Sequence, residues 1–332
     1  MQKSSPIVSV VLPVYNGKAY LKEAIDSVLN QSFGNFEMVI IDDGSTDDSA
    51  DLVRAYDDPR IRFYEQENQG LAATLNRGVA LAKGEFIARQ DQDDICLPTR
   101  FEKQIDWFEK HPEAGMVGTA AEIWVGRTKT ERVLQHPTED ALIRFGLLFH
   151  NHFVHSSVMI RKMALDDVGG YSEDSRRQPP EDYELWSRIM RHYQVGNLPD
   201  ILTVYREVDG SMSRTGINPF VPNLIRISSE NLAWVSGYSE DAPEVVALVS
   251  LHQGAYEKIS KGVKLSHVLK VLKVAADSIH AESEGVVNAL YQAVSRERRK
   301  IIYHYFNWRS GGMLDKWLKF CIRVFSKARV LN

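Results

Sequence analysis

Apolar and polar positions follow two different spacings over about the first 90 residues. Short β-prone apolar runs occur at positions 7–12, 37–41, 61–64 and 85–88. The intervening stretches have helical spacing, with one face formed by Leu21, Ile25, Val28 and Leu29 and another by Leu71, Leu75 and Val79. This βαβαβαβ order predicts an α/β fold built on a mostly parallel, Rossmann-like sheet with helices on both faces.

Polar loops follow three of these predicted strands. The first strand leads into Pro13–Asn16, the second into Asp42, Asp43, Gly44 and Ser45, and the fourth into Arg89 and residues 91–94. Ligands of such sheets bind outside the carboxyl ends of the strands. Because all three loops are polar and two of them are acidic, this edge is the expected binding site.

The stretch "RQDQDDICLP" at residues 89–98 concentrates three carboxylates in four positions. A solvated turn that caps the following helix would explain them, but buried carboxylates would need a cation nearby. The phosphate-binding motifs G-x-G-x-x-G and G-x-x-x-x-G-K-[ST] are both missing after the first strand. Carboxylates repel phosphate unless a divalent cation lies between them, and oxygen ligands suit Mg²⁺ or Mn²⁺. The pattern therefore indicates a diphosphate bridged by a metal ion.

A further acidic pair begins the predicted helix "PPEDYELWSRIMRHY". Pro179 and Pro180 lead into it, and Glu181 and Asp182 occupy its first turn. A helix N-terminus stabilises carboxylates, so a purely structural role is one interpretation.

Composition limits the class of protein. The chain has 332 residues, of which 44% are hydrophobic and 25% charged, as expected for an ordinary globular protein. Two cysteines, Cys96 and Cys321, lie far apart and without metal-ligand spacing, which argues against a disulfide framework or a zinc site. No run is long enough to span a membrane, and no signal peptide is evident.

Charge is unevenly distributed along the chain. The net charge is −4, yet residues 296–332 hold ten Lys and Arg against Glu297 and Asp315. Apolar residues within this segment recur at helical spacing, at Leu314, Trp317, Leu318, Cys321, Ile322 and Phe325. This basic amphipathic helix could contact an anionic membrane or could pack on the protein.

Over residues 7–215, the chain resembles the inverting family 2 glycosyltransferases with the GT-A fold. The resemblance rests on "SVVLPVYNGKAYLKEAIDSVLNQSF", "FEMVIIDDGSTDDS", "NQGLAATLNRGVALAKGEFIARQDQDDICLPTR" and "PPEDYELWSRI", which occur in the order of the family. It implies a GT-A catalytic domain at 1–215, divided into a nucleotide-sugar half at about 1–125 and an acceptor half at about 126–215. A helical C-terminal region would occupy 216–332.

The resemblance assigns the ends of the first two strands to the nucleotide: Pro13, Val14, Tyr15, Asn16, Asp42 and Asp43. The ring of Tyr15 would pack on the nucleobase, and Asp43, helped by Asp42, would accept a hydrogen bond from it. From the residues alone, Tyr15 also fits a core position. The second loop likewise fits a helix-capping turn formed by Ser45 and Asp47.

The same resemblance assigns the acidic loop to the sugar nucleotide and its metal. Asp91 would approach the ribose with Gln92 beside it, and Asp93 would bind Mn²⁺ or Mg²⁺. Asn76 would contact the nucleotide, although a surface amide satisfied within the protein fits equally well. Asp94 is expected to cap the helix that follows.

On the acceptor side, Asp182 would be the catalytic base, with Glu181 in reserve. His155 could face the sugar or could be structural. Family members often read Y-R-x-H-x-x-S-x-S where this chain has Val208 in place of the histidine, which puts the metal shell in doubt. The Q-x-x-R-W element of processive synthases is missing, so transfer of a single sugar is expected.

The resulting expectation is an inverting, hexosyltransferase-type enzyme that uses a nucleoside diphosphate sugar, by preference a UDP-sugar. Its acceptor would be a glycan or lipid-linked hydroxyl in the synthesis of cell-envelope polysaccharide. It would be cytoplasmic, with peripheral contact at the inner membrane face through the C-terminal helix, and would bind no nucleic acid. A sugar-nucleotide-forming nucleotidyltransferase and a catalytically silent sugar-nucleotide-binding module are the alternatives.

Overall fold

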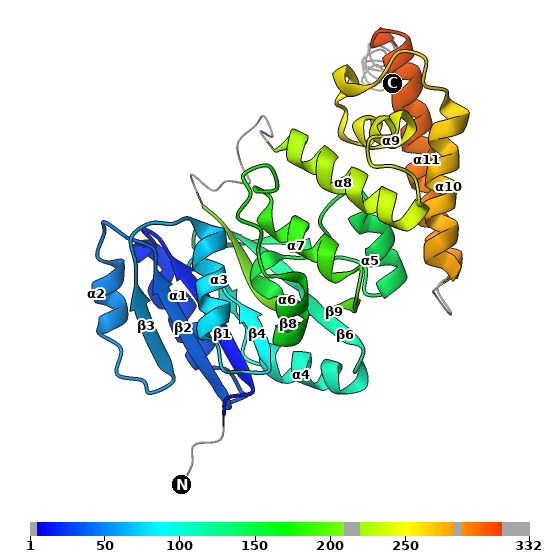
Figure 1. Ribbon diagram of the computed structural model, residues 1–332. Helices are drawn as coiled ribbons and strands as arrows, with labels where there is room; N and C mark the ends of the chain where they lie inside the picture. The colour runs from blue at the N-terminus through cyan, green and yellow to red at the C-terminus, as the bar shows by residue number, and fades with distance from the viewer. Residues whose placement is uncertain (1–4, 209–219, 282–286, 314–332) are drawn as a thin grey trace, which may run out of the picture. The chain divides into compact units, whose positions relative to one another are not determined.

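The computed structural model describes residues 5–208, 220–281 and 287–313. Its first half contains the four predicted strands: β1 (Val8–Val14), β2 (Phe36–Asp42), β3 (Ile61–Glu65) and β4 (Phe86–Arg89). They are parallel and lie in the order β3-β2-β1-β4, joined by α1 (Lys18–Leu29), α2 (Ser49–Arg54) and α3 (Leu71–Leu81) (Figure 1). The predicted α/β architecture is confirmed.

Beyond β4 the sheet becomes mixed, and nine strands of the described residues belong to it. Next to β4 lies the antiparallel β8 (Met159–Arg161), followed by β6 (Ala114–Val125), β9 (Gln194–Glu207) and β5 (Ile95–Cys96). The strands β6 and β9 are long and parallel to each other, while β7 (Thr128–Leu134) forms a hairpin with β6. These antiparallel pairs bring the second half of the chain beside the first.

Helices cover both faces of the sheet. The helices α1 and α4 (Arg100–Lys110) pack against the face of the sheet that carries Leu12. The helix α3 packs against the opposite face, which carries Val11. Gly78 allows that close approach, because a Cβ at this position would overlap the Val11 side chain. The second half contributes α5 (Asp140–Leu147), η1 (His155–Ser157), α6 (Lys162–Val168) and α7 (Glu181–Ile189).

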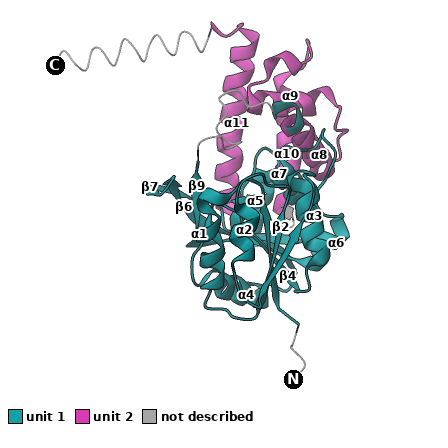
Figure 2. Cartoon of the chain, turned by 90° about the vertical axis from the view of Figure 1, so that its left-hand side faces the viewer, with its two compact units in different colours: residues 1–223 teal, residues 224–332 magenta. Residues whose placement is uncertain are grey.

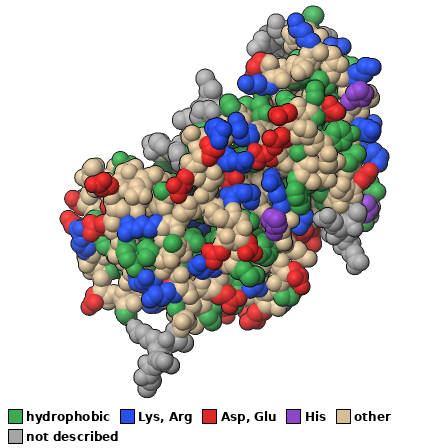
Figure 3. Space-filling view, viewed as in Figure 1, with side chains coloured by type: hydrophobic (Ala, Val, Ile, Leu, Met, Phe, Trp, Pro, Cys, Tyr) green, Lys and Arg blue, Asp and Glu red, His purple; other side chains and the backbone are tan. Residues whose placement is uncertain are grey.

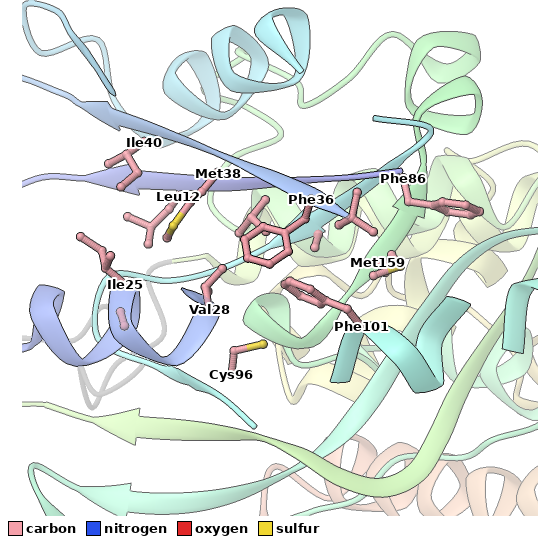
Figure 4. Close-up of a cluster of buried hydrophobic side chains, with 14 of the residues drawn as sticks. Leu12, Ile25, Val28, Phe36, Met38, Ile40, Phe86, Cys96, Phe101 and Met159 are labelled. Atoms are coloured by element: carbon pink, nitrogen blue, oxygen red, sulfur yellow. The ribbon is translucent and has the colours of Figure 1, made fainter. Parts of the chain in front are cut away.

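A hydrophobic cluster fills the space between the sheet and α1 and α4 (Figure 4). Leu12 and Met38 project from the strands toward Ile25 of α1, and Phe36 makes an edge-to-face contact with Phe101 of α4 at 5.7 Å between ring centroids. Cys96 lies in the same cluster as a free, buried thiol. The cluster supports the strand ends from which the functional loops emerge.

The chain divides into two compact units, residues 1–223 and 224–332 (Figure 2). Most of α8 (Val221–Ser236) belongs to the second unit, together with α9 (Pro243–Gln253), η3 (Tyr256–Lys258), α10 (Leu265–Ala281) and α11 (Val287–Arg309). In this unit His252 of α9 contacts Glu297 of α11 at 2.7 Å between Nδ1 and Oε1. Within the described ranges, no helix has the length and apolar character needed to cross a membrane.

The surface of the second unit is basic along α10, where lysine and histidine side chains gather in the space-filling view (Figure 3). Lys264, His267, Lys270 and Lys273 are all exposed. The amphipathic helix expected at residues 314–332 lies outside the described residues.

Candidate active site

The predicted ligand loops emerge at the carboxyl ends of three neighbouring strands, β2, β1 and β4. Neighbouring strands are about 4.8 Å apart, so the loops after them share one edge of the sheet. The backbone N–H of Asp43 donates to the carbonyl oxygen of Val14 at 2.8 Å, which links the first two loops directly. The sequence placed these loops correctly.

Tyr15 and Gln92 connect the loop after β1 to the acidic loop. The backbone N–H of Tyr15 donates to Gln92 Oε1 at 2.9 Å, and Gln92 Nε2 donates back to the Tyr15 carbonyl at 3.1 Å. The Tyr15 side chain is 49% exposed, so the core-packing interpretation is wrong. Pro13 and Val14 are buried in β1, and Gly17 leaves the room that the Gln92 side chain occupies.

The loop after β2 leads into α2, but most of its side-chain hydrogen bonds go to the start of α1. Ser45 Oγ accepts a hydrogen bond from the Asn16 N–H, Ser49 Oγ accepts one from Gly17, and Asp47 accepts one from Lys18. The Lys18 N–H belongs to the first residue of α1, where a helix leaves such groups unpaired, and the other two N–H groups lie just before the helix. Asp47 also accepts from the Ser49 N–H at the start of α2. The capping interpretation is correct for Asp47, whereas Ser45 binds an N–H group that precedes α1.

The Asp43 carboxylate accepts three hydrogen bonds from within the protein. Its carboxylate accepts hydrogen bonds from Gln66 Nε2 at 2.7 Å, from the Gln69 N–H at 2.8 Å and from the Gly70 N–H at 2.9 Å. It is only 4% exposed. Asp43 thus fixes the segment that leads into α3, and at most one of the four lone-pair sites of its carboxylate is left for a base.

Asp42 and Asn76 are also held by protein contacts. Asp42 accepts from the Ser45 N–H at 3.0 Å through Oδ2, while its Oδ1 is buried without a hydrogen-bond partner. The Asn76 amide donates to the Tyr171 carbonyl at 2.9 Å and accepts from the Tyr171 N–H at 2.8 Å. This geometry fits the satisfied-amide interpretation of Asn76, which ties α3 to the segment around Tyr171.

A buried arginine organises the centre of the site. Arg89, at the end of β4, is 2% exposed, and its Nη2 contacts Asp91 Oδ1 at 2.6 Å. Burial acts to raise the pKa of Asp91, but the Arg89 charge outweighs it and holds that pKa below its usual value. Asp91 is therefore an ionised, paired carboxylate.

His155 lies between Arg89 and the second acidic pair. Arg89 Nε donates to His155 Nε2 at 3.3 Å, and the Tyr171 hydroxyl lies 3.1 Å from the same nitrogen. A guanidinium only donates, so Nε2 must accept and the proton of the neutral ring is on Nδ1. That Nδ1 is 3.9 Å from Glu181 Oε1. Burial, and then the Arg89 charge, lower the pKa of His155 to about 3, so the ring is uncharged.

Asp93 is a partly exposed acid of this loop with no ion-pair partner in the described chain. Its carboxylate accepts a hydrogen bond from its own backbone N–H. Burial and then the charge of Asp91 raise the pKa of Asp93 to about 6. This partly exposed carboxylate is the one that gains most from a cation.

The prediction that Asp94 caps the following helix is wrong. The N-cap of α4 is Thr99, and Asp94 is buried, where it accepts hydrogen bonds from Ser156 Oγ and from the Arg206 N–H. Burial, then Asp91 and Asp93, raise its pKa well above the usual value. The intervening strand β5 turns Asp94 away from the helix and toward η1 and β9.

The acidic pair of the acceptor side begins α7, as predicted. Glu181 is 8% exposed, whereas Asp182 is more accessible. Asp182 Oδ2 accepts a hydrogen bond from Asn151 Nδ2 at 2.7 Å, and Oδ1 accepts one from the Tyr183 N–H at 2.6 Å. Burial and then the charge of Glu181 raise the pKa of Asp182 to about 7.

The two acidic sets belong to one electrostatic site. Asp91 contributes to the raised pKa of Asp93 and, more weakly, to that of Asp182, and Arg89 acts on Glu181. Within the described residues, no group of three His, Cys, Asp or Glu side chains forms a ready set of metal ligands. Val208 follows β9 where the family pattern has histidine. A cation at Asp93 would accordingly need oxygen ligands from the substrate.

Sequence reasoning missed Arg89 and Asn151. Arg89 stood in the quoted stretch beside the acids, and its position at the end of a buried strand was a signal that it would be buried and paired. Asn151 carried no signal, because it meets Asp182 only through the packing of η1 and α7. Tyr171 was missed for the same reason.

Comparisons with known proteins agree with this geometry. Residues 9–169 match the family described as Glycosyl transferase family 2. The amylovoran biosynthesis glycosyltransferase AmsE of Erwinia amylovora is 35% identical over 204 residues, which cover 60% of this chain and 75% of AmsE.

Solved structures show the same fold at lower identity. TarS residues 1–349 of S. aureus, in complex with UDP-GlcNAc, match with a TM-score of 0.59 at 18% identity over 92% of both chains. The mannosyltransferase PcManGT of Pyrobaculum calidifontis, in complex with GDP-Man and Mn²⁺, matches with a TM-score of 0.52 at 18% identity. That match covers 95% of this chain and 89% of PcManGT.

Proposed function

Because the chain belongs to glycosyl transferase family 2, we propose that it transfers a single sugar from a nucleoside diphosphate sugar to a glycan hydroxyl, with inversion at the anomeric carbon. One observation carries this proposal. Asp182 is an oriented, partly exposed carboxylate with a pKa of about 7, and the charge of Asp91 in the donor loop contributes to that raised pKa. The environment suits a base that must be ionised at neutral pH and still accept a proton.

In this reaction Asp182 removes the proton of the acceptor hydroxyl as its oxygen attacks the anomeric carbon, and the bond to the diphosphate breaks. Glu181 is the weaker candidate for this role, because it is nearly inaccessible. Its carboxylate faces the Nδ1–H of His155 instead. We assign Glu181 to raising the pKa, and with it the basicity, of Asp182.

The donor binds at the loops after β1, β2 and β4. Exposed Tyr15 is available to pack on the base, and its backbone is fixed by Gln92. Asp91, which is ionised and held by Arg89, is proposed to contact the ribose. UDP is the proposed nucleotide, and the similarity to TarS, solved with UDP-GlcNAc, supports this choice.

A divalent cation fits at Asp93. This carboxylate has a raised pKa, has no cationic partner within the described chain and is partly exposed, so a bound cation would relieve its repulsion with Asp91. Mg²⁺ and Mn²⁺ are often held by one or two carboxylates together with substrate phosphates. Such an ion, seen as Mn²⁺ in PcManGT, would stabilise the negative charge of the departing diphosphate.

The acceptor is proposed to be a growing polysaccharide, consistent with the amylovoran role in the name of AmsE. A lipid-linked acceptor would place the enzyme at the inner membrane face, where the exposed lysines of α10 would meet anionic lipid. Family membership favours sugar transfer over nucleotidyl transfer, and the experiment below separates an active enzyme from a silent binding module.

The test is release of UDP from UDP-glucose, UDP-galactose and UDP-GlcNAc, with Mn²⁺ and with or without isolated membranes as acceptor. Asp182→Asn should lower the rate about 100-fold or more, since a general base contributes on that scale. Asp93→Asn should abolish the Mn²⁺ dependence of UDP binding in calorimetry. Glu181→Gln should retain more activity than Asp182→Asn.

Asp166→Asn, at an exposed acid of α6, is the matched control and should behave as the wild type. Undiminished activity of Asp182→Asn would remove the base assignment. Pyrophosphate release from UTP and a sugar phosphate would instead support a nucleotidyltransferase. Binding of UDP without any turnover would support the silent module.

A further inference from the structure

Asn151 bridges the proposed base and the backbone of the neighbouring segment. It lies between α5 and η1, half-buried, and its Oδ1 accepts a hydrogen bond from the Phe153 N–H at 2.9 Å. Its Nδ2 donates to Asp182 Oδ2 at 2.7 Å. Because a backbone N–H can only donate, the atom that faces it must be the amide oxygen. The amide therefore has one orientation, with the NH₂ group toward Asp182.

Two donors thus fix both oxygens of the Asp182 carboxylate. The Tyr183 N–H holds Oδ1 at 2.6 Å and the Asn151 amide holds Oδ2. The terminal torsion of an aspartate is soft, so a carboxylate without such contacts samples a broad range of orientations. Each oxygen keeps a free lone-pair site, through which it can receive a proton.

We propose that Asn151 is the positioning residue of the catalytic base: it fixes the plane of the Asp182 carboxylate and favours its ionised form. This inference rests on the proposed function of Asp182. It extends that function to a residue from a different element, about thirty positions earlier in the chain.

The surroundings of Asp182 explain why such a donor is needed. Glu181 on the same helix and Asp91 on the loop after β4 both oppose its ionisation, and the Tyr171 hydroxyl also lies near these acids. His150 and His152 flank Asn151, and His152 is kept neutral by burial, which lowers its pKa to about 3. Among the contacts that lower the pKa of Asp182 are the Tyr183 N–H and then Asn151. Asn151 is thus the side chain that counteracts two neighbouring carboxylates.

The first experiment compares the pH profiles of the wild type and Asn151→Ala. Loss of a hydrogen bond to the charged form should move the acid limb of kcat to higher pH by about one unit. It should also lower kcat about tenfold at neutral pH, with KM for the donor little changed. A purely structural residue would lower the amount of folded protein without moving this limb.

Asn197→Ala is the matched control. Asn197 donates to the His152 carbonyl at 3.1 Å and to the Pro137 carbonyl at 2.9 Å, so it anchors the same segment without touching Asp182. The acid limb of this variant should stay in place. An equal shift in both variants would show general loosening of the segment and would overturn the proposal.

A second experiment needs no turnover. Carboxyl ¹³C resonances of Asp-labelled protein, with Asp182 assigned through its loss in Asp182→Asn, should titrate near pH 7 in the wild type and about one unit higher in Asn151→Ala. Identical midpoints would overturn the proposal even in an active enzyme. If the midpoint shifts but the protein has no transferase activity, the effect of Asn151 on Asp182 would stand and the proposed function would be rejected.

Circular dichroism establishes that each variant is folded. If Asn151→Ala does not fold, Asn151→Ser takes its place in both experiments. Serine keeps a donor, but it is too short to bridge Phe153 and Asp182. The same shift is expected for this variant, and an unchanged limb and midpoint would again overturn the proposal.

Discussion

Three aspartates of this site differ in protonation behaviour because each meets a different neighbour. Asp91 is ion-paired with Arg89, Asp93 has a like charge beside it, and Asp182 is a half-buried acid next to Glu181. The pKa of the first is lowered, while those of the other two are raised to about 6 and about 7. Environment, rather than residue type, separates the paired acid from the proposed metal ligand and the proposed base.

The raised pKa of Asp182 predicts a stability cost for the protein without ligands. The folded state binds this proton more tightly than the unfolded state, whose pKa is near 3.8, so Asp182 makes stability fall as pH rises from about 4 to about 7. Asp182→Asn removes this dependence. The melting temperature of the variant, relative to the wild type, should rise by a few degrees between pH 5 and pH 8.

Thermal unfolding of both proteins in low-salt buffer across this range measures the effect. Asp166→Asn, at an exposed acid, should give a constant difference from the wild type. A difference that stays constant for Asp182→Asn as well would mean that Asp182 titrates near its ordinary pKa. The base assignment would then lose its electrostatic support.

At the scale of elements, the junction between β2 and α3 depends on one buried carboxylate. Asp43 receives the N–H groups of Gln69 and Gly70 together with the side-chain amide of Gln66. Gly70 precedes α3 with φ of 86°, a conformation that favours glycine. The segment from β3 to α3 is therefore shaped around Asp43.

Asp43→Ala should lower the free energy of unfolding by about 2–3 kcal/mol, because two backbone donors and one side-chain amide lose their buried acceptor. Urea denaturation measures this loss. The affinity for UDP should fall at the same time, since the loop after β2 adjoins the proposed base pocket. Gln66→Ala, which removes a single side-chain donor, should cost less than 1 kcal/mol and serves as the comparison.

An unchanged unfolding free energy for Asp43→Ala would contradict the structural role. In that case the carboxylate would be free for the base contact that the family resemblance implied. A large loss of stability together with normal UDP affinity would confine Asp43 to the structural role. The two measurements together decide between these assignments.

At the scale of the whole chain, charge is divided between the two compact units. Residues 224–332 contain sixteen Lys and Arg and ten Asp and Glu, a net charge of +6, which leaves −10 for residues 1–223. Exposed lysines gather on α10 (Figure 3). The acidic unit carries the proposed chemistry, and the basic unit suits an anionic surface.

We expect the full chain to bind vesicles that contain phosphatidylglycerol and to be released by high salt. Reversing the charge of three exposed lysines, Lys270 and Lys273 of α10 and Lys264 just before it, should weaken binding at least about tenfold, since each lysine near an anionic surface contributes roughly 1 kcal/mol. Cosedimentation measures the partitioning.

Reversal of three exposed lysines in the first unit, Lys22, Lys83 and Lys110, is the control and should have a smaller effect. Deletion of residues 314–332 tests the expected amphipathic helix separately. Equal weakening by both triple variants would indicate dependence on net charge alone. Binding that no variant changes would remove the membrane proposal for α10 and for the tail.

The sequence by itself determined the features that depend on local periodicity and on strand ends. The alternation of apolar runs and helical faces specified β1 to β4 and the helices between them, and it placed Tyr15, Asp43 and Asp91 at one edge of the sheet. The start of α7 at Glu181 and Asp182 could also be predicted from the sequence, because proline followed by acidic residues is a local signal for the start of a helix.

Only the tertiary structure decided which of these side chains face one another. Asp43 and Asn76 make their hydrogen bonds within the protein. Asp94 binds Ser156 rather than capping α4, and Asn151 reaches Asp182 from another segment of the chain. These contacts join residues far apart in the chain, and no local pattern encodes them. Burial and neighbouring charge, which set each pKa, arise only when the sheet brings its loops together.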